Sequence, residues 1–371
     1  MADSLDGAVT RPAVLVFGGC GFVGRNLVHY LIENELASYV RIVDKVPPQV
    51  AWLNKAHQAV FDDARVEFKS ANLINAASCD QAFEGKQFQF AVNCASETKL
   101  GHEDEVYEEG VYQLSLNCAL SAAKHGVDKF IEVSTGQMWS DKTIHSEDDE
   151  VSPWTTIARY KYKLEQELKN ISNLNYSIIR PSIVYGKGDK SALGGRLLIT
   201  PLYQELTEPL KLLWGEDVGM NTIHVLDLVR AIWHLATVAP NGLYLASDEG
   251  QTTQGLLMSS IGKVFGVEPT YVSSIVLSVC STADIMAIAD EANDRHAGPW
   301  ANACRKGGVK NTPLSTFIIS EQLLNRHIKL NNFKLKSTGF RFLHPQITEE
   351  LIRDIIEDYI AMNMFPSQLL P

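Results

Sequence analysis

The sequence predicts an α/β fold in which helices cover both faces of a doubly wound parallel sheet, with a smaller region after it. Short runs rich in β-branched and aromatic residues alternate with segments whose apolar residues recur at helical spacing. A glycine-rich turn joins the first such run to the first such helix. The 371 residues, 45% of them hydrophobic, are enough to bury a large core.

The first predicted strand, Val14 to Phe17, runs into the sequence Gly18-Gly19-Cys20-Gly21-Phe22-Val23-Gly24. We expect Gly19 to allow a tight turn, Gly21 to let the backbone approach a pyrophosphate, and Gly24 to let the next helix pack against the strand. The phosphates would lie at a helix N-terminus, where free N–H groups and the helix dipole stabilise negative charge. The segment therefore predicts a dinucleotide-binding turn of the Rossmann type.

The segment after the glycines predicts an amphipathic helix and then a second strand. The helix is indicated by four apolar residues at helical spacing: Leu27, Val28, Leu31 and Ile32. The strand, Val40 to Val43, ends in Asp44, about 20 residues after Gly24, where an acid that accepts the ribose hydroxyls is expected. Because this carboxylate would repel the additional phosphate of NADP, we expect NAD to be the preferred cofactor.

Further strands continue the alternation: Val66 to Phe68, Phe88 to Val92, Lys129 to Val133 and Tyr176 to Ile179. The helix before the Lys129 strand has one apolar face and ends at Gly126. After about Gly186 the alternation breaks, and prolines punctuate irregular connections. This change predicts a smaller substrate-binding region in place of more doubly wound sheet.

Composition narrows the classes of partner and compartment. Lys and Arg number 33 against 44 Asp and Glu, a net charge of −11, so we expect neither nucleic acid nor an anionic membrane as a partner. The six cysteines include no C-x-x-C pair, and residues 1–12 contain neither an apolar nor an arginine-rich amphipathic segment. These features favour a cytoplasmic setting. The ten histidines show no metal-ligand spacing, so no metal is expected.

Six segments occur in a fixed order over most of the chain. They are Phe17 to Gly24, Asn93-Cys94-Ala95-Ser96, Val133-Ser134-Thr135, Arg180 to Gly186, Ile223 to Ile232 and Asn241 to Ala246. Together they resemble the extended short-chain dehydrogenases/reductases, specifically the NAD-dependent epimerase/dehydratase family. The resemblance implies a Rossmann domain with NAD as cofactor, and a small-molecule substrate that presents a hydroxyl or a carbonyl.

The resemblance also sets the domain boundaries and cofactor contacts that we expect. Residues 12–185 are expected to form the NAD-binding Rossmann domain, which the segment 223–246 rejoins. Residues 186–222 and 247–371 are expected to form the substrate-binding region. The expected cofactor contacts are Gly18, Gly19, Gly21, Phe22, Val23, Gly24, Asp44, Asn72, Leu73, Asn93, Ala95 and Lys161.

The family mechanism implies a Ser/Thr hydroxyl that holds the substrate oxygen, a Tyr that moves the proton, and a Lys four residues later. Residues i and i+4 share a helix face, so the ammonium favours phenolate and also holds the ribose. Thr135 is expected as the hydroxyl. The Tyr-x-x-x-Lys pattern is degraded: a register with Lys161 puts Ile157 at the tyrosine position, and a register with Lys163 puts Arg159 there.

Tyr160 is the candidate replacement, because it lies three residues before Lys163 and i, i+3 neighbours share a helix face. The catalytic candidates are therefore Thr135, Tyr160 and Lys161. A second departure concerns an Asn that supports the active site in the family. Counting without gaps puts Tyr112 at its place, whereas a shift of one helical turn brings Asn117 there.

Three residues near predicted strand ends have a structural and a functional interpretation. Tyr185 is expected as a packed aromatic or a substrate contact, and His224 as a hydrogen-bonded residue near a helix start or a site residue. Asp227 is better explained as a helix cap than as a catalyst.

Two functions that keep the nucleotide remain open from the sequence. One is an atypical NAD-dependent enzyme acting on a nucleotide-sugar or sterol-like substrate, in which Tyr160 or a water moves the proton. The other is a non-catalytic NAD-binding sensor or accessory subunit of a larger assembly. A scaffold that has lost the nucleotide is the third alternative. Many relatives dimerise through two helices, which here would end near Gly126 and Asn170.

Overall fold

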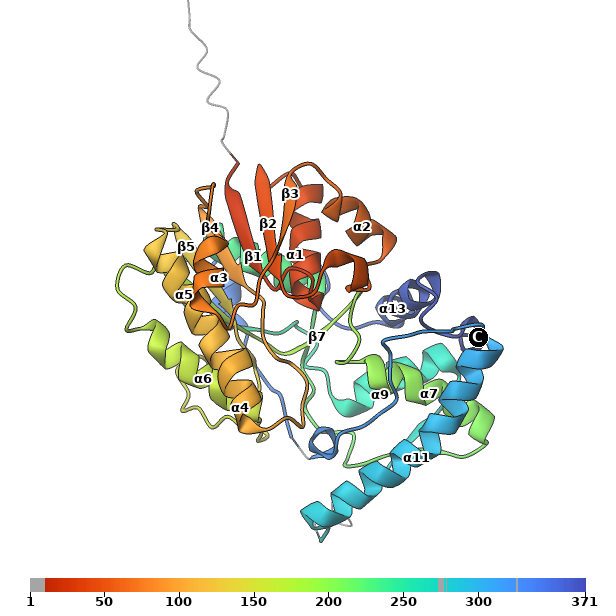
Figure 1. Ribbon diagram of the computed structural model, residues 1–371. Coiled ribbons are helices and arrows are strands. Elements are labelled where there is room, and N and C mark those ends of the chain that lie inside the picture. The colour runs from red at the N-terminus through yellow and green to blue at the C-terminus, as the bar shows by residue number, and fades with distance from the viewer. Residues whose placement is uncertain (1–10, 273–276, 278, 325) are drawn as a thin grey trace, which may run out of the picture.

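The central element of the protein is a seven-stranded, fully parallel sheet (Figure 1). The computed structural model describes residues 11–272, 277, 279–324 and 326–371, so the expectation for residues 1–12 lies almost wholly outside the described residues. The strand order β10-β6-β5-β4-β1-β2-β3 confirms the predicted doubly wound sheet. The strands are β1 (Ala13–Phe17), β2 (Tyr39–Asp44), β3 (Val66–Ser70), β4 (Phe90–Asn93), β5 (Lys129–Val133), β6 (Tyr176–Pro181) and β10 (Gly242–Ala246).

Helices cover both faces of this sheet. One face carries α1 (Phe22–Glu33), α2 (Lys55–Phe61) and α8 (Val225–Thr237), and the other carries α3 (Ala76–Gln81), α5 (Leu114–Lys124) and α6 (Thr156–Leu168). Strand β1 is apolar throughout because helices cover both of its faces. Val14 and Val16 pack with the first group of helices, whereas Leu15 and Phe17 pack with the second.

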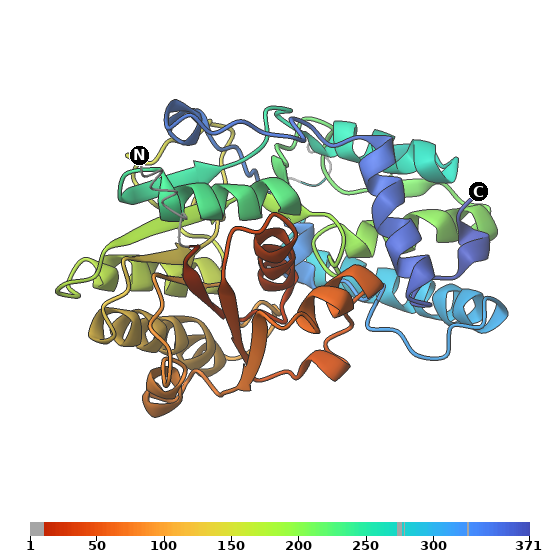
Figure 2. The ribbon, with the colours of Figure 1, turned by 90° about the horizontal axis from the view of Figure 1, so that it is seen from above.

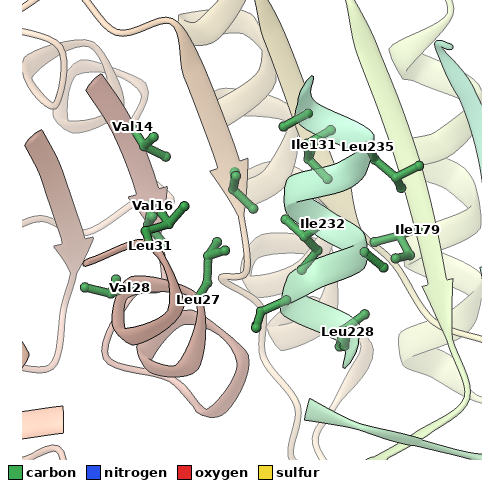
Figure 3. Packing of buried hydrophobic residues seen from close by; sticks show 14 of the residues in the cluster. Val14, Val16, Leu27, Val28, Leu31, Ile131, Ile179, Leu228, Ile232 and Leu235 are labelled. Carbon is green, nitrogen blue, oxygen red and sulfur yellow. The ribbon is translucent and has the colours of Figure 1, made fainter. Parts of the chain in front are cut away.

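Helices α1 and α8 lie side by side on the sheet (Figure 3). Their apolar side chains reach the same layer of strand residues, and those labelled in the figure are Leu27, Val28, Leu31, Leu228, Ile232, Leu235, Val14, Val16, Ile131 and Ile179. The helix expected from the spacing of Leu27 to Ile32 is therefore confirmed, because its apolar stripe is the face that covers β1.

The helix before β5 is irregular at its start. Helix α4 (Asp104–Tyr107) continues through a π-helical segment, η2 (Glu108–Gln113), into α5. A π-helical turn holds more residues than an α-helical turn, so positions before Leu114 are rotated relative to a regular helix. The helix face on which a residue before Leu114 lies therefore cannot be found by counting back from α5 with regular α-helical spacing.

Several later helices lie together beside the sheet (Figure 2), around a second apolar core. Its helices are α7 (Gly194–Leu206), α9 (Gln254–Phe265), α11 (Thr282–Lys306) and α13 (Glu349–Ala361). Two short parallel pairs accompany them, β7 (Ile183–Tyr185) with β9 (Thr222–His224) and β8 (Leu210–Leu212) with β11 (Pro269–Tyr271). The short elements are η1 (Pro48–Val50), η3 (Ser320–Leu323), α12 (Phe333–Ser337) and η4 (Ser367–Leu369).

The glycine turn after β1 is clasped between neighbouring strands. Gly18 has a left-handed backbone, with φ of +73°, and its N–H donates to Val43 O of β2 at 2.8 Å. A Cβ on Gly18 would lie 2.5 Å from Ala95 N, just after β4. The conformational freedom expected at Gly19 is therefore required at Gly18. Gly19 instead lies against Ile42, where a Cβ would approach the side chain to 2.6 Å.

Gly24 behaves as expected, because it permits close packing of α1 on the end of β1. A Cβ at Gly24 would lie 2.7 Å from Gly19 Cα and would also overlap Gly18 O. Backbone cannot move aside as a flexible side chain can, so the position requires glycine.

Gly18→Ala should destabilise the protein more than Gly85→Ala. Gly85 has nearly the same φ, +72°, but a Cβ there would meet nothing within 4 Å. The Gly85 variant therefore bears only the left-handed penalty, about 1–2 kcal/mol, whereas the Gly18 variant adds a clash with backbone. Thermal unfolding followed by circular dichroism measures both. Equal losses of Tm would show that the turn can open without cost.

Candidate active site

The N-terminus of α1 is open toward the carboxyl ends of the strands. The helix begins after Gly21, which has no side chain to cap it, and its first turn contains no acidic residue. The N–H groups of Phe22 and Val23 therefore have no intrahelical acceptor. Gly21 is exposed, and a Cβ on it would approach only Gly18 O, at 3.1 Å. These donors, with the positive end of the helix dipole, form a cradle suited to a diphosphate.

A buried arginine lies beneath this cradle. Arg25 is 2% exposed and donates to the carbonyls of Gly21 at 3.1 Å, of Trp52 and Ala51 at 2.7 Å each, and also of Cys20. Burial lowers the pKa of its guanidinium, which nevertheless stays charged because arginine does not deprotonate in proteins. Its charge therefore adds to the positive potential of the turn.

Sequence reasoning missed Arg25, although a signal was present. Arg25 lies three residues before Val28 and seven before Ile32, so it shares their buried helix face. A lone arginine on the apolar stripe of a helix indicates a buried guanidinium that contacts backbone carbonyls.

Asp44 lies beside the glycine turn, as the spacing suggested. Its carboxylate accepts hydrogen bonds from Cys20 N and Val46 N, each at 3.0 Å. The N–H of Ala71 donates to Asp44 O at 3.1 Å, which brings the segment after β3 alongside. In that segment Asn72 is exposed and Leu73 is buried. The turn, Asp44 and Asn72 thus lie together at the carboxyl edge of the sheet. Doubly wound sheets bind their ligands in a crevice outside this edge, and we use the word crevice for this place.

The end of β4 lies at the same edge of the sheet. Asn93 is fully buried, and its side-chain oxygen accepts from Ala95 N at 3.0 Å. Its amide nitrogen donates to Ser115 Oγ at 3.0 Å and to Glu132 Oε2 at 2.8 Å. Because Ala95 also touches Gly18, the structure brings both predicted residues of β4 up to the glycine turn.

Thr135 and Lys161 both lie near the end of β5. Thr135 follows the strand by two residues and is half-buried, and its hydroxyl accepts from Gln137 N at 3.2 Å. Lys161 comes from α6 and is 4% exposed. Its ammonium donates to Glu132 Oε1 at 2.7 Å and to Val133 O at 2.9 Å. Of the two lysine registers left open by the sequence, this placement favours the one with Lys161.

Lys163 lies on a different side of α6. It is exposed, donates to Glu108 at 2.8 and 3.1 Å, and stands 4.0 Å from the centre of the Tyr112 ring. The register with Lys161 puts Ile157, one turn earlier, where the family tyrosine is expected. Isoleucine has no group that can exchange a proton.

Tyr160 lies on the side of α6 that carries Lys163. Its ring centre is 5.8 Å from the Lys163 ammonium. Partial desolvation and the negative charges of Asp104 and Glu108 raise the pKa of Tyr160, which disfavours phenolate. Successive helical residues are rotated by about 100°, so Tyr160 cannot share the buried direction of Lys161. The structure does not bring this catalytic candidate together with Thr135.

The two positions considered for the supporting Asn of the family have contacts away from Thr135 and Lys161. Tyr112 contacts Lys163, as described above. Asn117 is turned toward the loop after β3, where it donates to Ile74 O at 2.8 Å and Leu73 O at 3.3 Å. From this helix it is Ser115 that contacts Asn93 and thus the interior of the site.

A second buried ion pair fixes α6 on the sheet. Glu165 accepts from Arg180 of β6 at 2.5 and 3.1 Å and from Ser134 Oγ at 2.6 Å. Both charged side chains are almost completely buried. Because Lys161 and Glu165 are four residues apart on one helix face, this pair sets the direction in which Lys161 points.

Tyr185 and His224 pack together near the edge of the crevice. Tyr185 is fully buried, and its ring centre lies 5.2 Å from that of His224, which contacts His344 at 4.2 Å. Burial and His344 lower the pKa of His224 to about 3, so it stays neutral. Its Nδ1 accepts from Leu226 N at 3.3 Å and caps α8, which confirms the structural interpretation.

The capping role expected of Asp227 is wrong. His224 occupies that position, and the buried Asp227 carboxylate instead accepts from Leu343 N, His344 N and Arg230 at 2.7–2.8 Å. Asp227 therefore attaches a C-terminal loop to α8.

Two further features bear on the chemistry. No group of three or more His, Cys, Asp and Glu side chains within the described residues could hold a metal ion. No helix in the same part of the chain combines the length and hydropathy needed to cross a bilayer.

The sequence is similar to those of two known proteins. The chain is 24% identical over 221 residues to the spore coat polysaccharide biosynthesis protein SpsK of Bacillus subtilis, a match that covers 58% of this chain and 75% of that protein. It is 27% identical over 183 residues to a putative UDP-glucose 4-epimerase of Methanocaldococcus jannaschii, covering 47% and 56% of the two chains.

Solved structures show the same fold. The UDP-glucose 4-epimerase of Thermotoga maritima, with UDP-glucose, has a TM-score of 0.66 at 19% identity, covering 94% of this chain and 98% of that one. The enzyme of Thermus thermophilus, in complex with NAD, has a TM-score of 0.65 at 18% identity, covering 94% and 99%. The model of the NAD dependent epimerase/dehydratase family matches residues 14–244. More than half of the chain matches, and the protein belongs to the NAD dependent epimerase/dehydratase family.

Proposed function

We propose that this protein binds NAD and acts as an NAD-dependent enzyme on a hydroxyl or carbonyl of a nucleotide sugar. The observation that carries the proposal is that the uncapped start of α1, Asp44 at the end of β2, and Asn93, Thr135 and Lys161 at the ends of β4 and β5 all lie at one edge of the sheet. Relatives and structural neighbours named for UDP-sugars favour a nucleotide sugar over a sterol-like substrate.

The residues fit a dinucleotide. The N–H groups of Phe22 and Val23, above Arg25, would hold the diphosphate, and Asp44 would accept the hydroxyls of the adenosine ribose. The exposed Asn72 would border the adenosine, and Lys161 would hold the nicotinamide ribose. When bound, NAD supplies the acceptor or donor of hydride. The protein supplies position and charge.

The substrate end of the site departs from the family pattern. Thr135 offers a half-buried hydroxyl to the substrate oxygen. Ile157 cannot exchange a proton, and Tyr160 is among acidic side chains on another side of α6. Of the two groups considered for proton transfer, we therefore propose a water at Thr135 and not Tyr160.

A second candidate function is a non-catalytic NAD-binding sensor or accessory subunit. Ile157 at the tyrosine position favours it, and so does the Lys161 ammonium, whose charge is already balanced by Glu132. In either case we propose a cytoplasmic protein. A homodimer through α5 and α6 remains our expectation.

Calorimetry on protein stripped of nucleotide, titrated with NADH and NADPH, tests the shared part of both candidates. Tight NADH binding supports the crevice, whereas no binding of either nucleotide rejects both. A screen of UDP-sugars, with NADH absorbance and product analysis as readouts, then separates them. An enzyme converts one of the sugars, and a sensor binds NADH yet converts none.

Asp44→Ala should weaken NAD binding by about tenfold or more, because hydrogen bonds to a charged acceptor are lost. NADP should lose much less, since the same substitution removes a repulsive charge. The measurement is calorimetry with both nucleotides. Asp62→Ala, at the exposed end of α2, is the matched control and should leave both affinities unchanged. Equal losses for NAD and NADP would place Asp44 away from the ribose.

If the protein is an enzyme, Lys161→Met should abolish turnover, and Lys163→Met should leave most of it. Lys161 lies at the end of β5, whereas Lys163 pairs with Glu108 at the surface. Steady-state rates with the converted sugar measure the difference, after circular dichroism has shown that both variants are folded. The reverse ranking would select the other lysine register.

A further inference from the structure

A fully buried carboxylate, Glu132, lies at the end of β5 and belongs to none of the motifs recognised in the sequence. It stands directly opposite Asn93 in the register of β4 and β5. Buried carboxylates are costly unless they are paired and hydrogen-bonded, so its presence calls for a specific partner.

Both oxygens of Glu132 are engaged. Oε1 accepts from the Lys161 ammonium at 2.7 Å, and Oε2 accepts from the Asn93 amide at 2.8 Å. The pair is hidden from solvent, with the Lys161 side chain 5% and the Glu132 side chain 0% exposed. Of the other charged groups, Glu165 is the one that acts on Glu132, and it is itself paired with Arg180. The two charges of the pair therefore cancel within the site.

The position of the pair follows from the sheet. Ligands of doubly wound sheets lie beyond the carboxyl ends of the strands, where the strand order reverses. Here the reversal lies between β1 and β4. Asp44 on β2 would take the adenosine end of a dinucleotide, so the nicotinamide end extends over β4 and β5. Asn93, Glu132 and Lys161 come from β4, β5 and the helix packed on them.

We propose that Glu132 is a positioning residue that holds the Lys161 ammonium at the end of β5 and cancels its charge, so that the site accepts the cationic nicotinamide of NAD⁺ as readily as neutral NADH. This inference rests on the proposed function, because it requires that a nicotinamide dinucleotide occupies the crevice. It does not require turnover, so it applies to the enzyme and to the sensor alike.

The two redox forms of the cofactor differ by one charge on the ring, and an uncompensated ammonium beside that ring acts on only one of them. Loss of the carboxylate alone leaves a buried cation that repels NAD⁺. Loss of the lysine alone leaves an anion that attracts it. Loss of both charges leaves the site neutral again.

The experiment compares Glu132→Gln, Lys161→Met and the double variant, with calorimetric Kd values for NAD⁺ and NADH and the fluorescence of bound NADH. In Glu132→Gln the ratio of the NAD⁺ Kd to the NADH Kd should rise by roughly tenfold, which is the order of change in affinity that one uncompensated charge near the ring produces inside a protein. In Lys161→Met the ratio should fall. In the double variant it should return to near the wild-type value.

Asp227→Asn is the matched control, because it removes an equally buried carboxylate that pairs with Arg230 and attaches a C-terminal loop to α8. It should lower the melting temperature and leave the ratio unchanged. A ratio that is the same in Glu132→Gln as in the wild type, or that the double variant does not restore, would overturn the inference. If the wild-type protein binds neither nucleotide, it is the proposed function that fails.

Discussion

The close packing of the glycine turn between β2 and β4 is the constraint on which the rest of the molecule depends. Gly18 contacts the segments on both sides of β1. Its N–H donates to Val43 O of β2, and because it has no side chain, Ala95 after β4 can approach its Cα closely. Gly24 then lets α1 start within van der Waals distance of this turn. These contacts leave the N-terminal N–H groups of α1 facing the crevice, so strand order, helix position and anion cradle follow from one backbone conformation.

Arg25, Lys161 and Arg180 are buried cations near the carboxyl ends of the strands, and their partners are of two kinds. Arg25 contacts backbone carbonyls, Lys161 pairs with Glu132, and Arg180 pairs with Glu165. Buried ion pairs add little net stability, because desolvation offsets much of their attraction, but the loss of one partner costs several kcal/mol. Their role here is orientation. The Arg180 pair sets the rotation of α6, and that rotation points Lys161 at the end of β5.

The same rotation decides which residue lies one turn before the buried lysine. Lys161 is directed inward, so the residue one turn earlier on that face is Ile157, and Tyr160 is carried to the acidic side of the helix. The nucleotide cradle at the start of α1 is present, whereas an apolar residue, Ile157, lies one turn before Lys161. Both proposed functions share this feature and differ in whether a water replaces the phenol.

The sequence by itself determined the alternation of strands and helices, the glycine turn and the place of Asp44, because these depend on local periodicity and on fixed spacing within one βαβ unit. It also gave Thr135 and the two lysine registers as candidates. Tertiary structure distinguishes Lys161 from Lys163, since both lie on one helix and only the packing of α6 on β5 and β6 buries one of them. Glu132, Arg25 and Arg180 gained their roles in the same way, because the partners of a buried charge come from strands and loops far away in the chain.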